Sequence, residues 1–326
     1  MHADAQGEFE IIARYFSRHS PRRDVLLGVG DDAAVLQVPA DRRLVAAMDT
    51  VVEGVHFPVG TAARHIGHRA LAVNLSDLAA MGAEPAWALL SLSLPRSDPH
   101  WLQGFADGFY DLAQLHNVAL VGGDTVRGPL VVTVQVLGLV ETDHVLKRSG
   151  ARAGDVLYVS GIPGEAAAGL AVIQRHLDGG VAGEWLRQRF ERPEPRIALG
   201  RALRQLASSA MDVSDGLLAD LGKLCQASSC AAVLHLDRLP ASPAMQALFG
   251  GGASERFALA GGDDYELLFT LAPDRAGDLK WLADCGVQCT RIGEMVQALP
   301  GVSPVRCVRA GMPVDVDAPG YDHFVG

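Results

Sequence analysis

The chain has 326 residues, of which 49% are hydrophobic and 20% are charged, a mixture that is typical of soluble globular proteins and long enough for two domains. The formal net charge is −10, and because an acidic surface repels polyanions, neither nucleic acid nor a membrane is an expected partner. The longest apolar stretch, residues 130–140, is too short for a membrane helix of ~20 residues. The five cysteines form no CxxC pair, so we expect reduced, mostly buried thiols in a cytoplasmic protein.

Helical and strand patterns alternate along the chain, which predicts an α/β or α+β fold. In the first half, the patterns predict helices at 9–18, 63–81 and 101–115, and strands at 25–27, 33–37, 44–48, 86–94, 119–121 and 130–140. The basic, glycine-bearing segment 147–154 marks the expected boundary between an N-terminal domain, 1–148, and a C-terminal domain, 149–326.

The second half is predicted to open with a strand at 155–160. The patterns further predict helices at 165–176, 196–207 and 217–227, and strands at 231–236 and 265–271 among further helices. The C-terminal tail is spaced by prolines and glycines, and no element is assigned to it.

Aspartates that follow glycines or end apolar runs recur in both halves. They occur in the segments GVGDDAAV (28–35), MDTVVEGVHF (48–57), NLSDLAAMGAEP (74–85), VGGDTVRGP (121–129), MDVSDGL (211–217) and GGDDYELLF (261–269). A single aspartate of this kind often just forms a turn. As a converging set, however, the carboxylates would repel each other without a cation, and their hard oxygen atoms suit Mg²⁺ together with substrate phosphates.

The segment GVGDDA also fits a relaxed dinucleotide-binding fingerprint. That fingerprint places pyrophosphate against bare backbone amides at a helix N-terminus, where Asp31 and Asp32 would repel it unless a metal intervened. The apolar run that follows also resembles a strand more than a helix. The sequence contains no GxxxxGK[ST], HExxH, GxSxG or CxxC motif, which excludes a P-loop and argues against the commonest zinc and serine-hydrolase sites.

Three further residues have two interpretations each. Arg148 is either a solvated linker residue or a clamp for phosphate, a role that an acidic chain needs from some cation. His56 is either structural or a substrate contact, and Tyr321 either packs at a core edge or stacks on a heterocycle. The residues alone leave these alternatives open.

Taken in order, the motifs resemble those of the thiamine-monophosphate kinase family, a member of the aminoimidazole ribonucleotide synthase-like superfamily. The resemblance extends from GEFEIIARYF (7–16) to GYDHF (320–324), and its most specific parts are NLSDLAAMGAEP, GGDTVRGP, VSDGL and GGDDYEL. It implies a two-domain subunit with an N-terminal α/β domain that forms a homodimer through its sheet, and a C-terminal α/β domain. It also implies ATP as co-substrate, several Mg²⁺ ions and thiamine monophosphate as acceptor.

The resemblance also assigns roles to individual residues. The implied metal ligands are Asp32, Met48, Asp49, Asp77, Asp124, Asp212 and Asp215, of which Asp49, Asp77, Asp124 and Asp215 are the expected catalytic group. Gly123, Asp124, Arg148 and Ser214 would contact ATP, and His56, Asp263 and Tyr321 would contact the substrate. The chain departs from the family pattern at Ala47 and Met48, where hydroxyl residues are usual, so that Met48 offers only its carbonyl. It also departs at Asp263, where the family commonly has the longer Glu.

Both lines of reasoning predict direct in-line phosphoryl transfer, which needs positioning and charge neutralisation more than covalent help. A phosphate monoester is largely a dianion at neutral pH, since its second pKa is near ~6, so the acceptor needs no general base. Two alternatives remain. The chain could be another ATP-dependent member of the superfamily, such as a purine-pathway synthetase, or a non-catalytic protein that binds nucleotides or divalent cations.

Overall fold

The computed structural model describes residues 7–18, 22–276 and 279–316. The chain forms two compact units. Unit 1 comprises Met1–Leu78 and Ala83–Asp143, and unit 2 comprises Ala79–Gly82 and His144–Gly326. The division predicted between residues 148 and 149, with nucleotide binding and dimerisation assigned to the first part, stays a prediction.

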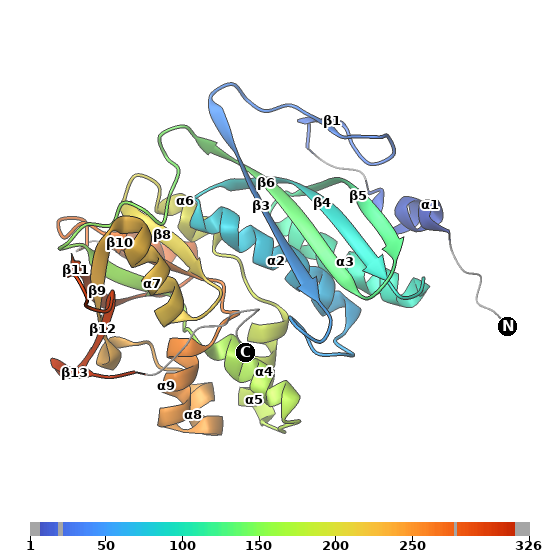
Figure 1. Ribbon diagram of the computed structural model, residues 1–326. Coiled ribbons are helices and arrows are strands. Elements are labelled where there is room, and N and C mark those ends of the chain that lie inside the picture. The colour runs from blue at the N-terminus through green and yellow to red at the C-terminus, as the bar shows by residue number, and fades with distance from the viewer. Residues whose placement is uncertain (1–6, 19–21, 277–278, 317–326) are drawn as a thin grey trace. The chain divides into compact units, whose positions relative to one another are not determined.

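Unit 1 contains a small sheet, two long helices and an N-terminal segment (Figure 1). Its elements are α1 (Glu8–Ile11), the π-helical turn η1 (Ile12–Phe16), β1 (Val25–Leu27), β2 (Val35–Leu36), β3 (Arg42–Val52), α2 (Ala63–Ala80), β4 (Glu84–Leu94), α3 (Pro99–Leu115), β5 (Ala119–Arg127) and β6 (Val131–Glu141). Four strands form a sheet in the order β3-β6-β4-β5, in which β4 and β5 are parallel and the other neighbours are antiparallel. β1 and β2 pair with each other.

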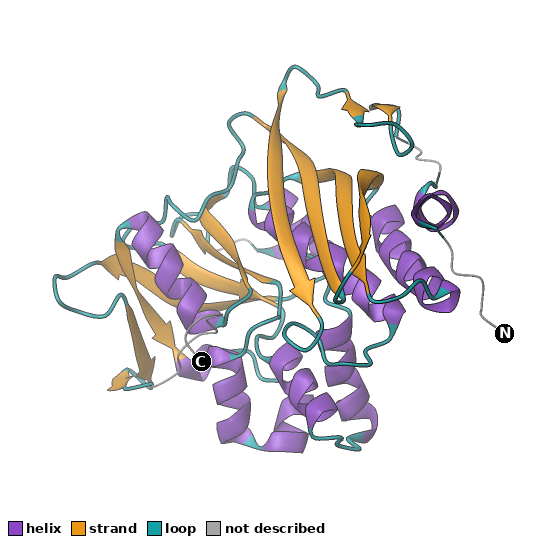
Figure 2. Cartoon of the chain, turned by 45° about the vertical axis from the view of Figure 1, so that its right-hand side comes forward, coloured by secondary structure: helices purple, strands orange, loops and turns teal. Residues whose placement is uncertain are grey.

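The four-stranded sheet has a covered face and a more open face. On β6, Val132, Val134 and Val136 are fully buried, whereas Thr133 and Gln135 between them are partly exposed, because successive side chains of a strand point to opposite faces. The helices α2 and α3 lie along the covered face (Figure 2). The two helices pack closely, since a Cβ atom on Gly108 of α3 would lie 1.9 Å from the carbonyl oxygen of Arg64 on α2.

Unit 2 is built on a seven-stranded sheet with the strand order β13-β12-β9-β11-β7-β10-β8. Its elements are β7 (Val156–Ser160), α4 (Glu165–Gln174), α5 (Gly180–Glu191), α6 (Ile197–Ala202), β8 (Ala207–Val213), α7 (Leu217–Ser228), β9 (Cys230–His235), the 3₁₀ turn η2 (Leu236–Arg238), α8 (Pro243–Phe249), α9 (Gly251–Ala260), β10 (Glu266–Leu271), the 3₁₀ turn η3 (Lys280–Cys285), β11 (Cys289–Gln297), β12 (Val305–Arg309) and β13 (Met312–Val314). Leu217, Leu221 and Leu224 of α7 are fully buried and belong to one core with the sheet.

The mixed helix-and-sheet class is confirmed. The strand at 25–27 has the predicted ends, the helix predicted at 9–18 is the short α1 followed by the π-helical turn η1, and the other predicted elements of unit 1 are present with shifted ends. The helix predicted at 196–207 is wrong in its second half, because α6 ends at Ala202 and β8 begins at Ala207. The first residues of β8, ASSA, are small and polar, and their strand conformation depends on pairing with β10. The prediction also omitted the strands β8, β11, β12 and β13, and it gave no residue range for the further helices, which are α5, α8 and α9.

Within the described ranges, no helix combines the length and apolar character that a membrane crossing requires. The five cysteines are all free thiols. Cys225 and Cys307 are buried, and the other three are partly exposed, so the prediction of mostly buried thiols holds for two of the five.

Candidate functional site

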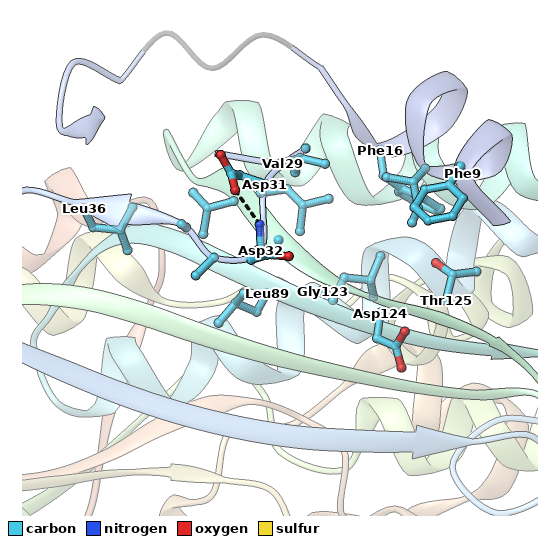
Figure 3. A pocket seen from close by; sticks show the side chains of 18 residues that line it. Phe9, Phe16, Val29, Asp31, Asp32, Leu36, Leu89, Gly123, Asp124 and Thr125 are labelled. Carbon is cyan, nitrogen blue, oxygen red and sulfur yellow. Dashed lines mark hydrogen bonds between the residues drawn. The ribbon is translucent and has the colours of Figure 1, made fainter. Parts of the chain in front are cut away.

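A pocket of about 710 Å³ in unit 1 brings together three of the predicted site residues, Asp32, Gly123 and Asp124. Figure 3 shows Asp32 toward one side of the pocket and the rings of Phe9 and Phe16 toward the other, above Asp124 and Thr125. Much of the remaining lining is aliphatic or backbone, including Val29, Leu36, Leu89 and Thr125. The pocket therefore combines an apolar wall with carboxylates, a lining that suits a flat ring attached to a charged group.

Gly123 allows β5 to run close against β4. Its φ angle is +149°, and a Cβ atom at this position would lie 1.8 Å from the carbonyl oxygen of Leu90. Any side chain here would push the two parallel strands apart, so only glycine fits. The next residue, Asp124, pairs with Ser91 of β4, and its side chain is exposed.

Asp32 lies in the turn between β1 and β2. Its backbone N–H donates a hydrogen bond of 2.8 Å to the carboxylate of the preceding residue, Asp31 (Figure 3). The Asp32 side chain is exposed. Asp31 and Asp32 both line the pocket, and Asp31 also forms this local contact with the backbone.

Asp49 and Asp77 are not among the residues that line this pocket. Asp49 lies on β3, an edge strand of the sheet, and Asp77 lies on α2. The backbone N–H of Asp49 donates a 2.8 Å hydrogen bond to the amide oxygen of Asn74, a fully buried residue of α2. Asp77 follows Asn74 by three residues on the same helix, so the two side chains project from the same side of α2. Asn74 therefore connects the strand that carries Asp49 to the helix that carries Asp77.

The two remaining candidates of unit 1 lie on and just after β3. Met48 pairs with Gln135 on the open face of the sheet, and 64% of its surface is exposed. His56 is in the turn that follows β3, where its Nδ1 accepts a hydrogen bond of 3.1 Å from the Val52 backbone N–H. An accepting Nδ1 places the proton of a neutral ring on Nε2.

In unit 2, the loop after β8 carries Ser214 and Asp215. The fully buried Asp220 of α7 accepts hydrogen bonds of 2.9 Å from the backbone N–H groups of both residues. The Lys223 ammonium donates to Asp220, at 2.7 Å, and also to the Asp215 carboxylate. Burial alone would lower the pKa of Lys223, but hydrogen bonds to the two carboxylates outweigh burial and raise it, so the ammonium is charged at neutral pH.

A second loop, residues 261–265, lies directly on the first. The backbone N–H of Asp263 donates 2.9 Å to the carbonyl oxygen of Ser214, and the Tyr265 hydroxyl donates 3.1 Å to the Asp263 carboxylate. Asp263 and Tyr265 have φ angles of +70° and +53°, which are strained values for residues other than glycine. The strain lies at a predicted substrate contact, as is common for functional loops.

Asp264, between these two residues, attaches the loop to the start of α4. Its carboxylate accepts hydrogen bonds from the backbone N–H groups of Gly164 and Ala166, at 2.5 and 3.1 Å. Burial raises the pKa of Asp264 well above its usual value, although the two N–H groups oppose that shift. Asp264 is thus a positioning residue that faces away from solvent, unlike its neighbour Asp263.

Glu266 anchors the other end of this loop in a buried ionic network. Its fully buried carboxylate accepts hydrogen bonds from Arg189 at 2.7 Å, from Arg196 Nε at 2.7 Å and from Ser160 at 2.6 Å. Burial by itself would raise the pKa of Glu266, but Arg196 and Arg189 outweigh it and hold the pKa below its ordinary value. The network connects β10 to β7, α5 and the start of α6.

Asp212 lies just before the first of these loops, whereas the backbone of Arg148 lies beside the middle of β8 and the end of α7. The Arg148 backbone carbonyl accepts a hydrogen bond from Ser228, and the preceding Lys147 carbonyl accepts one from Ala210 of β8. The Arg148 side chain is exposed. Asp212 is buried within β8 opposite Leu267. Tyr321 lies outside the described residues.

The donor set fits Mg²⁺ in its chemistry. The predicted ligands are carboxylates, apart from Met48, and one of them, Asp215, already binds a cation in the form of the Lys223 ammonium. No group of three or more His, Cys, Asp or Glu side chains able to hold a metal ion occurs among the residues described. This is compatible with Mg²⁺, which usually binds one or two carboxylates and takes its other ligands from water and substrate phosphates.

Sequence reasoning did not identify Asn74, Asp220, Lys223, Asp264 or Glu266. All five lie within or beside the motifs that it did identify. An acidic residue in the first turn of a helix, followed three residues later by lysine, is a readable signal for the Asp220–Lys223 pair. No comparable signal marks Glu266, whose arginine partners are 70 and 77 residues away in the chain.

Comparison with known proteins gives matches over nearly the whole chain. The family model for the AIR synthase related protein N-terminal domain matches residues 30–140, and that for the C-terminal domain matches residues 152–301. A thiamine-monophosphate kinase from Salmonella typhimurium is 47% identical over 324 residues, which cover 98% of this chain and 99% of that protein.

Two solved structures are similar in fold and sequence. The crystal structure of thiamine-monophosphate kinase from Stenotrophomonas maltophilia K279a has a TM-score of 0.83 and 46% identity, and the match covers 90% of this chain and 93% of that one. The structure of AaThiL complexed with AMPPCP and TMP has a TM-score of 0.77 and 29% identity, and the match covers 91% and 92% of the two chains.

Proposed function

The chain belongs to the AIR synthase related proteins and, within them, to the thiamine-monophosphate kinases. We therefore propose that it transfers a phosphoryl group from ATP to thiamine monophosphate, giving thiamine diphosphate and ADP. The observation that carries this proposal is the 47% identity over 98% of the chain with a kinase of that name. The two-ligand complex of AaThiL, with AMPPCP and TMP, supports the same pair of substrates. A reaction that consumes ATP also favours a cytoplasmic location.

We propose roles for the site residues from the family pattern, taken unit by unit. In unit 1, the pocket at Asp32, Gly123 and Asp124 would receive the nucleotide, with Gly123 leaving room for close backbone approach. In unit 2, Arg148 and Ser214 would contact the ATP phosphates, and the strained loop at Asp263 would contact the acceptor. His56 would also contact the acceptor. The proposed Mg²⁺ ligands are the carboxylates Asp32, Asp49, Asp77, Asp124, Asp212 and Asp215, with the Met48 carbonyl.

In the proposed mechanism, the protein positions two phosphates and accepts no proton. The acceptor oxygen of thiamine monophosphate is already ionised at neutral pH, because its second pKa is near ~6. When bound, Mg²⁺ would neutralise charge on the phosphate oxygens. The chain's own contribution would be to hold the metal ions with carboxylates, to orient ATP through Arg148, and to keep the acceptor in line through the 261–265 loop.

An ADP-release assay with saturating MgATP tests this proposal. We expect turnover with thiamine monophosphate and essentially none with thiamine, whose alcohol would need a residue to accept its proton. The rate should decline as the pH falls below ~6, as the acceptor phosphate becomes protonated. Equal turnover of the two acceptors would contradict the base-free mechanism. Turnover of formylglycinamidine ribonucleotide instead would support the purine-pathway alternative, and no ADP release with either acceptor would support a non-catalytic binding protein.

We also propose that the open face of the sheet in unit 1 forms a symmetric homodimer interface. Leu44, Met48 and Val126 on this face expose 48%, 64% and 47% of their surface, and exposed apolar side chains on one sheet face favour association. Sedimentation at micromolar concentration should give a dimer mass, and Leu44→Glu should shift it toward the monomer. A monomeric wild-type protein with full activity would contradict the proposal.

A further inference from the structure

The Asp215 carboxylate binds an ammonium group that its own unit supplies. Lys223 Nζ donates to Asp215 Oδ2 and, at 2.7 Å, to Asp220 Oδ1. The other oxygen of Asp220 accepts the backbone N–H groups of Ser214 and Asp215 at 2.9 Å each. One buried carboxylate thus shapes the loop and, at the same time, fixes a cation beside it.

A simpler interpretation is that Asp220 and Lys223, three residues apart on α7, form an ordinary helix-stabilising pair. That interpretation needs only the contact with Asp220. The ammonium also reaches Asp215, beyond the start of the helix. The burial of the three side chains differs as well, because Asp220 is fully buried, whereas Asp215 and Lys223 expose 36% and 40% of their side chains. The Asp215 end of the bridge is therefore the accessible one.

We propose that the Lys223 ammonium binds the Asp215 carboxylate in the metal-free protein and that Mg²⁺ displaces it from Asp215. The ammonium remains bound to Asp220 when this happens. The inference rests on the proposed function in one respect, namely that Asp215 is a metal ligand. A partly exposed ion pair is weak, so a divalent ion that also binds ATP phosphates can displace the ammonium. The buried contact with Asp220 persists, and the backbone of Ser214 and Asp215 keeps its shape.

This arrangement has a consequence for metal loading. Before metal binds, the ammonium neutralises Asp215, and the loop does not present an uncompensated carboxylate to the incoming ATP phosphates. The same ammonium competes with a bare divalent ion. Lys223 therefore weakens metal binding in the absence of nucleotide, and favours loading of the metal together with ATP.

The test is a titration of the full-length protein with Mn²⁺, followed by electron paramagnetic resonance, without nucleotide and with AMPPCP. Without nucleotide, Lys223→Met should bind Mn²⁺ about fivefold more tightly or better, the effect of removing an ion pair of that exposure. Lys223→Arg keeps the charge and should bind like wild type. Lys147→Met, the same substitution at another exposed lysine of unit 2, controls for net charge and should also bind like wild type.

The double variant Asp215→Asn with Lys223→Met locates the effect. It should bind Mn²⁺ no more tightly than Asp215→Asn alone, because the competition takes place on Asp215.

A second measurement does not depend on the folding of Lys223→Met. The sequence has only three lysines, Lys147, Lys223 and Lys280, so in ¹⁵N-lysine-labelled wild-type protein the Lys223 signal can be assigned by comparison with Lys223→Arg, and it should move on addition of Mg²⁺ and AMPPCP.

Two kinds of result would overturn the inference, and they differ in whether the metal role of Asp215 remains. Unchanged or weaker Mn²⁺ binding in Lys223→Met, or a Lys223 signal that does not move, overturns the role of Lys223 alone if Asp215→Asn still loses metal. Unchanged Mn²⁺ binding in Asp215→Asn overturns both the inference and the metal role of Asp215. Neither result bears on ADP release with thiamine monophosphate, which tests the proposed function separately.

Discussion

The pocket of unit 1 and the loops of unit 2 hold their carboxylates in different ways. In the pocket, Asp32 and Asp124 are exposed on a turn and a strand whose shape depends on glycine and backbone pairing. In the loops, Asp215 pairs with Lys223, and Glu266 is enclosed by arginines. An exposed carboxylate on which the fold does not depend is available to bind a ligand, whereas a carboxylate within a buried network stabilises the loop. Substitutions in the two regions should therefore separate activity from stability.

The largest expected effect is on stability, at Glu266. Glu266→Gln removes the fully buried charge of this ionic network and leaves Arg189 and Arg196 with only their weaker partners, Glu165 and Glu194, which should lower the free energy of unfolding by about 3–5 kcal/mol. Urea unfolding at neutral pH measures it. The control is Glu294→Gln, at a carboxylate that is one-third exposed and contacts His235 and Arg291, and it should change stability by less than about 1 kcal/mol.

The difference in unfolding free energy between wild type and Glu266→Gln also depends on pH. The pKa of Glu266 is lower in the folded protein than in the unfolded chain, so its contribution to stability is fully present above the unfolded pKa of Glu, about 4.3, and is lost as the pH falls through the folded value. The stability difference between wild type and Glu266→Gln should therefore shrink in acid. A difference that grows as the pH falls would show that Glu266 does not carry the charge in the folded protein.

The second effect is on activity, at Asp124 in the pocket. Asp124→Asn keeps the shape of the side chain but removes a charge from the proposed metal site, and kcat/KM should fall by about 100-fold or more, the scale of losing one electrostatic stabiliser. The free energy of unfolding should stay within about 0.5 kcal/mol, since the side chain is exposed. Asp111→Asn, at an exposed aspartate paired with Arg64, should leave both quantities near wild type. Normal turnover of Asp124→Asn at saturating Mg²⁺ would remove Asp124 from the proposed site.

The sequence predicted unit 1 better than unit 2, for a physical reason. On β6, buried valines alternate with partly exposed residues, which is the pattern that identifies a strand with one covered face. β8 begins with small polar residues and becomes a strand through its pairing with β10, so its local sequence carries little signal.

The candidate site shows the same limit. The glycine and aspartate motifs predicted which turns and strand ends carry carboxylates, because a turn that needs glycine is encoded by residues that are adjacent in the sequence. The sequence could not predict that Lys223 reaches Asp215, because that contact depends on the turn at Gly216, whose φ angle is +111°. Nor could it predict the partners of Glu266, because they come from α5 and the start of α6.

A smaller effect is expected at Arg148, an exposed arginine of unit 2. Arg148→Ala should raise KM for ATP about tenfold with little change in stability, the scale of one charge-assisted contact. Arg148→Lys should restore only part of the loss if the guanidinium binds phosphate through two N–H groups. Arg152→Ala removes another exposed arginine of the same segment and is the matched control. If Arg148→Ala and Arg152→Ala have the same KM for ATP, Arg148 is a solvated linker residue.

The smallest effect is expected at Asp263, where this chain departs from the glutamate of the family pattern. Its backbone is in the left-handed region, at φ +70°, and short polar side chains such as Asp tolerate this region better than Glu does. Asp263→Glu should therefore lower the free energy of unfolding by about 1 kcal/mol or less, within the usual range for strain at one residue.

The added methylene of Asp263→Glu also moves the carboxylate away from the Tyr265 hydroxyl, which donates a hydrogen bond to Asp263 in the wild-type protein. Because Asp263 is proposed to contact the acceptor, KM for thiamine monophosphate should change while KM for ATP and kcat stay near wild type. Tyr265→Phe is the control for the hydroxyl, since it removes that hydrogen bond and leaves the length of the acidic side chain unchanged. If Asp263→Glu alters KM for ATP as much as KM for thiamine monophosphate, the 261–265 loop acts on the nucleotide through its contact with Ser214, and Asp263 is a positioning residue for ATP.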